Sequence, residues 1–201
     1  MITLLNLIML KVGITGGIGS GKTLICTVFR ELNIPVYSSD ERAKNLMVSS
    51  PALVNEIKQL IGEKAYVNNT LNKQYIASII FRNKEMLNAL NNIVHPEVEK
   101  DFDQWYEKQH SHPYVLKEAA ILFESGSYKK MDKNILVVAP EELRIKWVKE
   151  RDNISEEKVR ERINNQWKTE RLIKLADFII DNSGNKLILP QIIEIDKKLR
   201  K

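Results

Sequence analysis

Cysteine is nearly absent from this chain of 201 residues, which contains only Cys26 and therefore no internal disulfide. A protein held together without disulfides suits a reducing compartment, and we expect it in the cytoplasm. Cys26 falls within an expected helix, where a buried and unreactive thiol is the common case.

Long apolar runs are also missing. No segment approaches the roughly 18 apolar residues that a membrane-spanning helix requires. The apolar start, MITLLNLIM, has neither the basic residues nor the small-residue cleavage site of a signal peptide. We therefore expect no membrane association. Residues 1–8 are interpreted as a tail ahead of the folded domain, with Met9 as an alternative translation start.

Signatures of nucleic-acid binding are not found either. The net charge is +5, but basic residues are spread along the chain, and from Glu141 to Lys174 they alternate with acidic ones. Such alternation is typical of solvent-exposed helix faces. The sequence contains no zinc knuckle, aromatic RNA-binding motif or basic zipper. We expect no nucleic-acid partner, and the positive charge suits a small polyanionic substrate.

Glycine is scarce, with eight residues in all, yet five lie in the stretch GITGGIGSGKT from Gly13 to Thr23. Its spacing, Gly16-x-x-x-x-Gly21-Lys22-Thr23, matches the phosphate-binding P-loop, and it lies between an expected strand (11–15) and an expected helix (22–32). Bare backbone lets successive N–H groups converge on phosphate oxygens, while lysine bridges the β- and γ-phosphates and threonine holds Mg²⁺. The predicted nucleotide-binding residues are Gly17, Ile18, Gly19, Ser20, Gly21, Lys22, Thr23 and Leu24, with Thr23 as the metal ligand.

Strand-like and helical patterns alternate along the rest of the chain, which indicates an α/β fold. Further strands are expected at 35–38, 114–118, 134–139 and 177–181, and further helices from Pro140 to about 152, after Ser155 and from about Leu187. Between 41 and 110 no strand is expected. Helical periodicity recurs there, with Pro51 and Pro96 interpreted as first-turn residues.

A P-loop alone does not define a reaction. The Asn-Lys-x-Asp motif of GTPases and the Leu-Ser-Gly-Gly-Gln signature of transporter ATPases are both absent from the sequence. Size and layout favour a small-molecule kinase, with one helical insertion over the acceptor and a helical lid over the phosphates. Two alternatives stay open: a related P-loop kinase of another nucleoside or small alcohol, and a regulatory nucleotide-binding protein.

Several motifs in a fixed order carry a more specific resemblance. Besides the P-loop they are Asp40, His95-Pro96-x-Val98, Leu122-Phe123-Glu124, Arg151-Asp152-x-x-Ser155, Arg162-Ile163-x-x-Gln166 and Ala176-Asp177-Phe178-Ile179-Ile180-Asp181-Asn182-Ser183-Gly184. From about Met9 to its end, the chain resembles the dephospho-coenzyme A kinases. The resemblance implies ATP- and Mg²⁺-dependent phosphorylation of the ribose 3′-hydroxyl of dephospho-CoA, the last step of coenzyme A synthesis.

The resemblance also implies an architecture: a three-layer P-loop core with a mainly parallel sheet of about five strands, a CoA-binding insertion and a lid. We expect the core at 9–39, 111–140 and 171–201, the helical acceptor-binding region at 40–110 and the helical lid at 141–170. The implied small-molecule partners are ATP and dephospho-CoA. The implied assembly is a monomer or a weakly self-associating protein.

Residue roles follow from the same motifs. The expected catalytic residues are Asp40, Lys22, Arg151 and Arg162; Arg144, Asn182 and Gly184 are expected to bind ATP, and Asp40, His95, Glu118 and Leu122 to contact the acceptor. Simpler readings remain: Asp40 as a helix cap, His95 as a structural residue, the arginines as solvated charge, and 181–184 as a plain turn.

Two departures from the family pattern stand out. Ser38-Ser39-Asp40 stands where Asp-Ala-Asp is usual, so only the second carboxylate remains. Glu118 stands where an aspartate is usual, and the proline that normally follows two residues later is lost. Neither change removes a group that we regard as indispensable.

Overall fold

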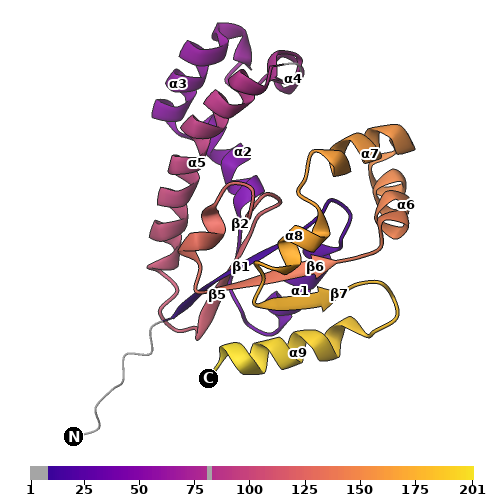
Figure 1. The fold of residues 1–201 in the computed structure, drawn as a ribbon. Helices are drawn as coiled ribbons and strands as arrows, with labels where there is room; N and C mark the ends of the chain where they lie inside the picture. The colour runs from indigo at the N-terminus through magenta and orange to yellow at the C-terminus, as the bar shows by residue number, and fades with distance from the viewer. Residues whose placement is uncertain (1–8, 81–82) are drawn as a thin grey trace, which may run out of the picture. The chain divides into compact units, whose positions relative to one another are not determined.

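The computed structural model describes residues 9–80 and 83–201 (Figure 1). They divide into two compact units, of which the first runs to Ser38 and resumes at Gln109–Lys201, and the second is Ser39–Lys108. The expected tail, residues 1–8, lies outside the described residues. Among the described residues, 9–80 and 83–201, no helix combines the length and apolar character that crossing a membrane would need.

The first unit is built on a five-stranded sheet in the order β2-β5-β1-β6-β7. Its strands are β1 (Leu10–Gly16), β2 (Val36–Ser38), β5 (Tyr114–Glu118), β6 (Lys133–Val138) and β7 (Phe178–Asp181). Every neighbouring pair runs parallel. Because β1 is central, the loop that follows it lies at the middle of the sheet's carboxyl edge, where α/β proteins bind ligands. The predicted parallel sheet is confirmed.

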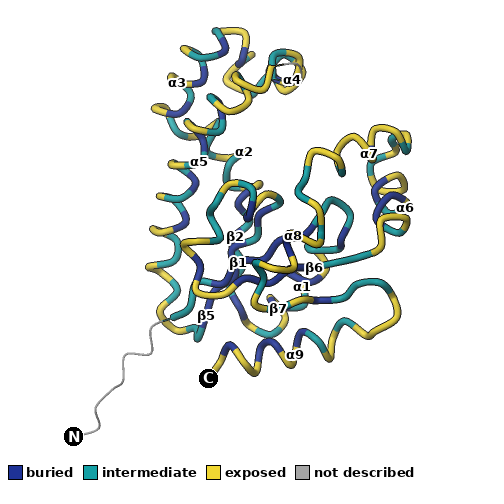
Figure 2. The backbone as a smooth tube through the Cα atoms, in the orientation of Figure 1, coloured by how far each residue is buried: buried dark blue, intermediate teal, exposed yellow. Residues whose placement is uncertain are grey.

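Helices cover both faces of this sheet, which gives three layers (Figure 1). α1 (Lys22–Glu31) and α9 (Ile188–Leu199) lie on one face, and α8 (Thr169–Ile173) lies on the other, with a 3-10 turn, η2, at Ser127–Lys130. α6 (Glu141–Asp152) and α7 (Glu156–Asn164) follow β6 and extend away from the sheet. Ile25 of α1 and Ile192 of α9 share one core with Ile14 of β1. On the other face, Leu172 of α8 packs with Leu136 of β6. Figure 2 shows β1, β5 and β6 mostly buried, as expected for the centre of a parallel sheet covered on both faces, while the edge strands β2 and β7 are partly exposed.

The second unit consists mainly of helices: α2 (Ser39–Ser49), α3 (Pro51–Ile61), α4 (Lys73–Ile80) and α5 (Lys84–Tyr106), with a 3-10 turn, η1, at Glu63–Ala65. Pro51 begins α3 as predicted. The Ser50 hydroxyl oxygen caps this helix by accepting a hydrogen bond from the Leu53 N–H at 3.4 Å.

The expectation that this insertion contains no strand is wrong. β3 (Tyr66–Val67) and β4 (Thr70–Leu71) form an antiparallel hairpin. Asn68 and Asn69 at its tip both have positive φ, and two adjacent residues of that kind make a tight hairpin turn. Strands of two residues are too short to show the alternation by which strands are recognised in a sequence.

The interpretation of Pro96 as a first-turn residue is also wrong, because Pro96 lies inside the 23-residue helix α5. An interior proline removes one N–H donor and usually interrupts a helix. The apolar face of α5 nevertheless continues past it, with Leu90, Val94 and Val98 buried at intervals of four residues. Packing along this face outweighs the local cost of the proline.

Candidate active site

The P-loop adopts a conformation that depends on its glycines. Gly19 and Gly21 have φ values of 77° and 92°, which side-chain-bearing residues rarely adopt. Gly21 is the N-cap of α1, and the hydrogen bond that closes this helix end runs from the Ile25 N–H to the Gly21 carbonyl. The N–H groups before Ile25 therefore have no acceptor within the helix. With no acidic side chain in this first turn, the helix end is suited to an anion.

Two side chains donate hydrogen bonds to backbone carbonyl groups of the P-loop. Lys22 Nζ donates to the Gly16 carbonyl oxygen at 2.7 Å. Asn182 was expected to bind ATP. Its Nδ2 donates to the Ser20 carbonyl oxygen at 2.9 Å, and its backbone N–H donates to the Val138 carbonyl. Asn182 thus connects the end of β7 to the P-loop. Gly184 lies farther along, in a turn with φ of 88° and open space around it.

Glu118 and Ser38 meet at the carboxyl ends of their strands. The Ser38 hydroxyl donates to Glu118 Oε2 at 3.0 Å, and the two residues are aligned in the β2–β5 pairing. Glu118 is also aligned with Ile14 of β1, two residues before Gly16. The pair therefore lies beside the strand that leads into the P-loop. Sequence analysis connected Glu118 with the acceptor but did not identify its partner.

Leu122 does not fit its expected role in substrate contact. It is fully buried, and a Cβ added to Gly13 would collide with Leu122 Cδ2. Leu122 therefore packs against the bare backbone of β1. Glu124 of the same motif accepts a hydrogen bond from the Trp167 N–H at 3.1 Å, so it anchors the segment between α7 and α8.

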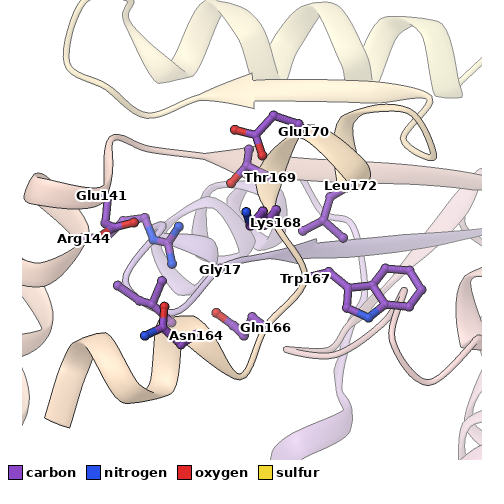
Figure 3. Close-up of a pocket in the computed structure, with 11 residues that line it drawn as sticks. Gly17, Glu141, Arg144, Asn164, Gln166, Trp167, Lys168, Thr169, Glu170 and Leu172 are labelled. Atoms are coloured by element: carbon purple, nitrogen blue, oxygen red, sulfur yellow. The ribbon is translucent and has the colours of Figure 1, made fainter. Parts of the chain in front are cut away.

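Arg144 of α6 lies against the P-loop. Only 7% of it is exposed, its Nε donates to the Ile18 carbonyl oxygen at 2.9 Å, and its guanidinium group covers Gly17. Burial lowers the pKa of Arg144, but a guanidinium remains charged in proteins. Within residues 9–80 and 83–201 its terminal nitrogens donate no hydrogen bond. Arg144 lines a cavity of about 300 Å³ (Figure 3).

Residues around this cavity were mostly missed by sequence analysis. The cavity is lined by Gly17, Glu141, Arg144, Ile163, Asn164, Gln166, Trp167, Lys168, Thr169, Glu170 and Leu172. Gln166 belongs to a recognised motif, but the motif alone assigned it no contact; its Oε1 accepts a hydrogen bond from the Ile18 N–H at 2.8 Å. Trp167 stacks with Arg171, whose guanidinium carbon lies 3.2 Å from the ring centroid. No spacing rule connects these residues to the P-loop.

Arg151 and Arg162, the predicted catalytic arginines, share one carboxylate. Arg151 Nε donates to Asp152 Oδ1 at 2.7 Å, and Arg162 Nη1 donates to Asp152 Oδ2 at 3.0 Å. More than half of each arginine side chain is exposed. The hydrogen bond from Arg151 is the main cause that lowers the pKa of Asp152. Two exposed guanidinium groups thus share one half-buried carboxylate.

Asp40 and His95 belong to the insertion. Asp40 is exposed in the first turn of α2, where a carboxylate is favoured by the helix dipole. His95 is half-buried on α5. No cluster of three or more His, Cys, Asp or Glu able to hold a metal ion occurs in the described part of the chain.

Cys26 is buried in α1, as predicted. Burial, assisted by the nearby Glu118 carboxylate, raises the pKa of its thiol to about 12. The thiol therefore stays neutral near pH 7, which is its unreactive form.

A parallel sheet with its central strand entering a P-loop, a lysine in the loop and a buried arginine over it define a P-loop kinase. The family model of dephospho-CoA kinase matches residues 10–187. The chain belongs to the dephospho-CoA kinase family.

Curated relatives agree with this assignment, and a solved structure shares the fold. A dephospho-CoA kinase of Porphyromonas gingivalis is 40% identical over 193 residues, which cover 96% of this chain and 95% of the relative. A dephospho-CoA kinase of Bacteroides fragilis is 37% identical over 186 residues, covering 92% and 91%. The crystal structure of TT1252 from Thermus thermophilus aligns with a TM-score of 0.82 at 31% identity, covering 95% of this chain and 96% of that one.

Proposed function

We propose that this protein transfers the γ-phosphoryl group of ATP to the ribose 3′-hydroxyl of dephospho-CoA, giving coenzyme A and ADP. The observation that supports a phosphoryl donor most directly is the P-loop, with an open helix end at α1 and the Arg144 guanidinium packed over Gly17. Membership of the family supports the acceptor.

In this proposal, the donor phosphates occupy the P-loop. Lys22 leaves the Gly16 carbonyl, 2.7 Å away, and bridges the β- and γ-phosphates. The N–H groups from Gly19 to Leu24 bind the remaining phosphate oxygens. Arg144 offers its terminal nitrogens to the transferring group, and being largely buried, it needs little rearrangement to do so. The turn from Asn182 to Gly184 lies beside the adenine.

Mg²⁺ fits the oxygen donors at the same edge of the sheet. This ion keeps several of its waters and binds through few protein oxygens together with substrate phosphates, so a dense cluster of carboxylates is not required. Thr23, exposed at the start of α1, supplies the direct hydroxyl ligand. Ser38 and Glu118 supply oxygens to the ion's water shell. When bound, Mg²⁺ neutralises charge that develops on the phosphates.

The acceptor half of the reaction is assigned to the insertion and the lid. Asp40 orients the 3′-hydroxyl and accepts its proton, the role of a general base within hydrogen-bond reach of the reacting group. His95 and Glu118 contact the acceptor. Arg151 and Arg162 exchange part of their bonding to Asp152 for the transferring phosphoryl group, and the lid over 141–170 limits the access of water.

The proposal extends to the setting in which the protein works. The single, buried and neutral thiol suits the cytoplasm. We assign it a monomeric or weakly self-associating state.

Acceptor-dependent release of ADP tests the proposed function. The purified protein with ATP and Mg²⁺ is given dephospho-CoA, nucleoside monophosphates, shikimate or no acceptor. Dephospho-CoA should accelerate ADP release far above the rate without acceptor, and the product should be coenzyme A. A response to another acceptor would identify the related-kinase alternative, and slow release that no acceptor changes would identify a regulatory nucleotide-binding protein.

A further inference from the structure

Ile18 of the P-loop is hydrogen-bonded to the lid segment at both of its backbone polar groups. Its carbonyl oxygen accepts a hydrogen bond from Arg144 Nε at 2.9 Å, and its N–H donates to Gln166 Oε1 at 2.8 Å. α6 and the segment after α7 thus supply partners for both backbone polar groups of a single P-loop residue. Figure 3 shows Arg144 and Gln166 on the wall of the cavity beside Gly17.

The side chain of Ile18 extends the same junction. It packs against a buried cluster of α6 and α7 whose members are Ile145, Val148 and Val159. At the next residue, Gly19, an added Cβ would lie 2.7 Å from Val148 Cγ2 and 2.7 Å from the Arg144 carbonyl oxygen. α6 therefore lies directly against the P-loop backbone, with no space between them for a side chain.

These contacts determine how two consecutive peptide groups are turned. Because a trans peptide is planar, holding the Ile18 N–H also orients the Gly17 carbonyl, which accepts the Ser20 N–H at 3.0 Å. Holding the Ile18 carbonyl likewise fixes the Gly19 N–H, which lies in the same peptide plane and points in the opposite direction. Gln166 thus controls the first plane and Arg144 the second.

We propose that Gln166 is a positioning residue for nucleotide binding. By holding the Ile18 peptide, it keeps the P-loop in the conformation in which the later N–H groups converge on the phosphates. Gln166 carries no charge and touches no reacting atom in this role, so it acts through the loop. This inference rests on the proposed binding of ATP phosphates at the P-loop, and it adds a route by which the lid segment influences that site.

The test combines a local measurement with a functional one on the full-length protein. In Gln166→Ala, the Ile18 amide should exchange its hydrogen with solvent at least about tenfold faster than in the parent, because it loses its acceptor. The dissociation constant for ATP, measured by calorimetry without acceptor, should rise about five- to tenfold, as expected for one lost hydrogen bond. The KM for dephospho-CoA should stay near the parent value.

Asn165→Ala is the matched control, because Asn165 is the exposed neighbour of Gln166. It should change neither the exchange of Ile18 nor the binding of ATP. Gln166→Glu keeps an oxygen acceptor at the same place and should restore the protection of the Ile18 amide. This second variant also answers the case in which Gln166→Ala does not fold.

Unchanged ATP binding in a folded Gln166→Ala protein would overturn the positioning role, whether or not exchange at Ile18 increases. Loss of Ile18 protection in Gln166→Glu as well would also contradict it. Lys22→Ala separates this outcome from a failure of the proposed function: if that variant binds ATP as tightly as the parent, the nucleotide site itself is wrongly assigned.

Discussion

The two compact units hold their candidate active-site groups in different ways. In the first unit, the Lys22 ammonium, the Asn182 amide and the Arg144 guanidinium each bond to a P-loop carbonyl. In the insertion, Asp40 is exposed and makes no hydrogen bond within the described part of the chain. The side chains around the candidate phosphate site are therefore already hydrogen-bonded without a ligand, whereas the carboxylate of the proposed base is not hydrogen-bonded to any described residue. A charge already held in place stabilises the reaction without rearranging, which in the proposed mechanism applies to Arg144, whereas Lys22 first exchanges the Gly16 carbonyl for the phosphates.

The largest effect on turnover is expected when the Lys22 ammonium is removed from the first unit. Lys22→Ala should lower kcat by roughly 10³-fold or more, because the ammonium compensates charge on the transferring phosphoryl group. The melting temperature should stay nearly the same, since the Lys22 ammonium bonds to a loop carbonyl and does not lie in the apolar core. Turnover close to the parent's, measured by ADP release, would contradict the P-loop assignment.

The insertion side is tested by neutralising its carboxylate. Asp40→Asn keeps the shape of the side chain but removes the charge, so kcat should fall by about 10²- to 10⁴-fold, the usual contribution of a general base. Binding of ATP, measured without acceptor, should hardly change, because the phosphate site belongs to the other unit.

Ser38→Ala is the matched control for Asp40→Asn. Its hydroxyl donates to Glu118, so its loss should cost roughly tenfold at most, through the water around Mg²⁺. If Ser38→Ala impaired turnover more than Asp40→Asn, Asp40 would be a helix-end residue and the acceptor assignment would be wrong.

The lid arginines combine features of both units. Arg151 and Arg162 are exposed, as Asp40 is, but each is hydrogen-bonded to Asp152. Arg151→Ala and Arg162→Ala should each lower kcat by about tenfold to 10²-fold, through lost compensation of phosphoryl charge. Lys149→Ala removes an exposed ion pair with Glu156, in which the nitrogen and oxygen are 3.4 Å apart, and should leave kcat nearly unchanged. Small and equal effects at all three positions would show that these charges are only a solvated surface.

The smallest effect is expected at Cys26. Since burial raises the pKa of its thiol to about 12, the reactive thiolate is scarce near pH 8, and iodoacetamide should label the folded protein far more slowly than the unfolded one. Mass spectrometry follows the labelling. Rapid labelling of the folded protein would show that α1 opens readily beneath the P-loop.

Features with a local cause were predictable from the sequence. The strands of the core follow from short apolar runs next to turns, and the P-loop follows from a spacing that only phosphate binding explains. α8 was not predicted, since five residues are too few for helical periodicity to show. The hairpin at 66–71 and the uninterrupted helix through Pro96 depend on packing that local patterns do not contain.

The candidate site divides along the same line. Lys22 and Thr23 could be placed because they belong to one contiguous motif. The bonds from Arg144 and Gln166 to Ile18 join residues 126 and 148 positions apart, so only the folded chain brings them together. Leu122 was assigned to substrate contact because it lies in a recognised motif, yet its side chain fills the space beside Gly13. A motif therefore indicates which residues are important, but it does not predict the direction in which their side chains point.

The strand order has a consequence for how the chain is made. β1 is synthesised first, but its partners in the sheet are β5 and β6, which begin at Tyr114 and Lys133. The segment Ser39–Lys108, by contrast, is contiguous, and its internal contacts become available as soon as Lys108 has left the ribosome. Contacts between distant segments form late, because they wait for the chain between them. The P-loop is therefore translated before the insertion, but the strand that leads into it gains its sheet partners only after the insertion has been made.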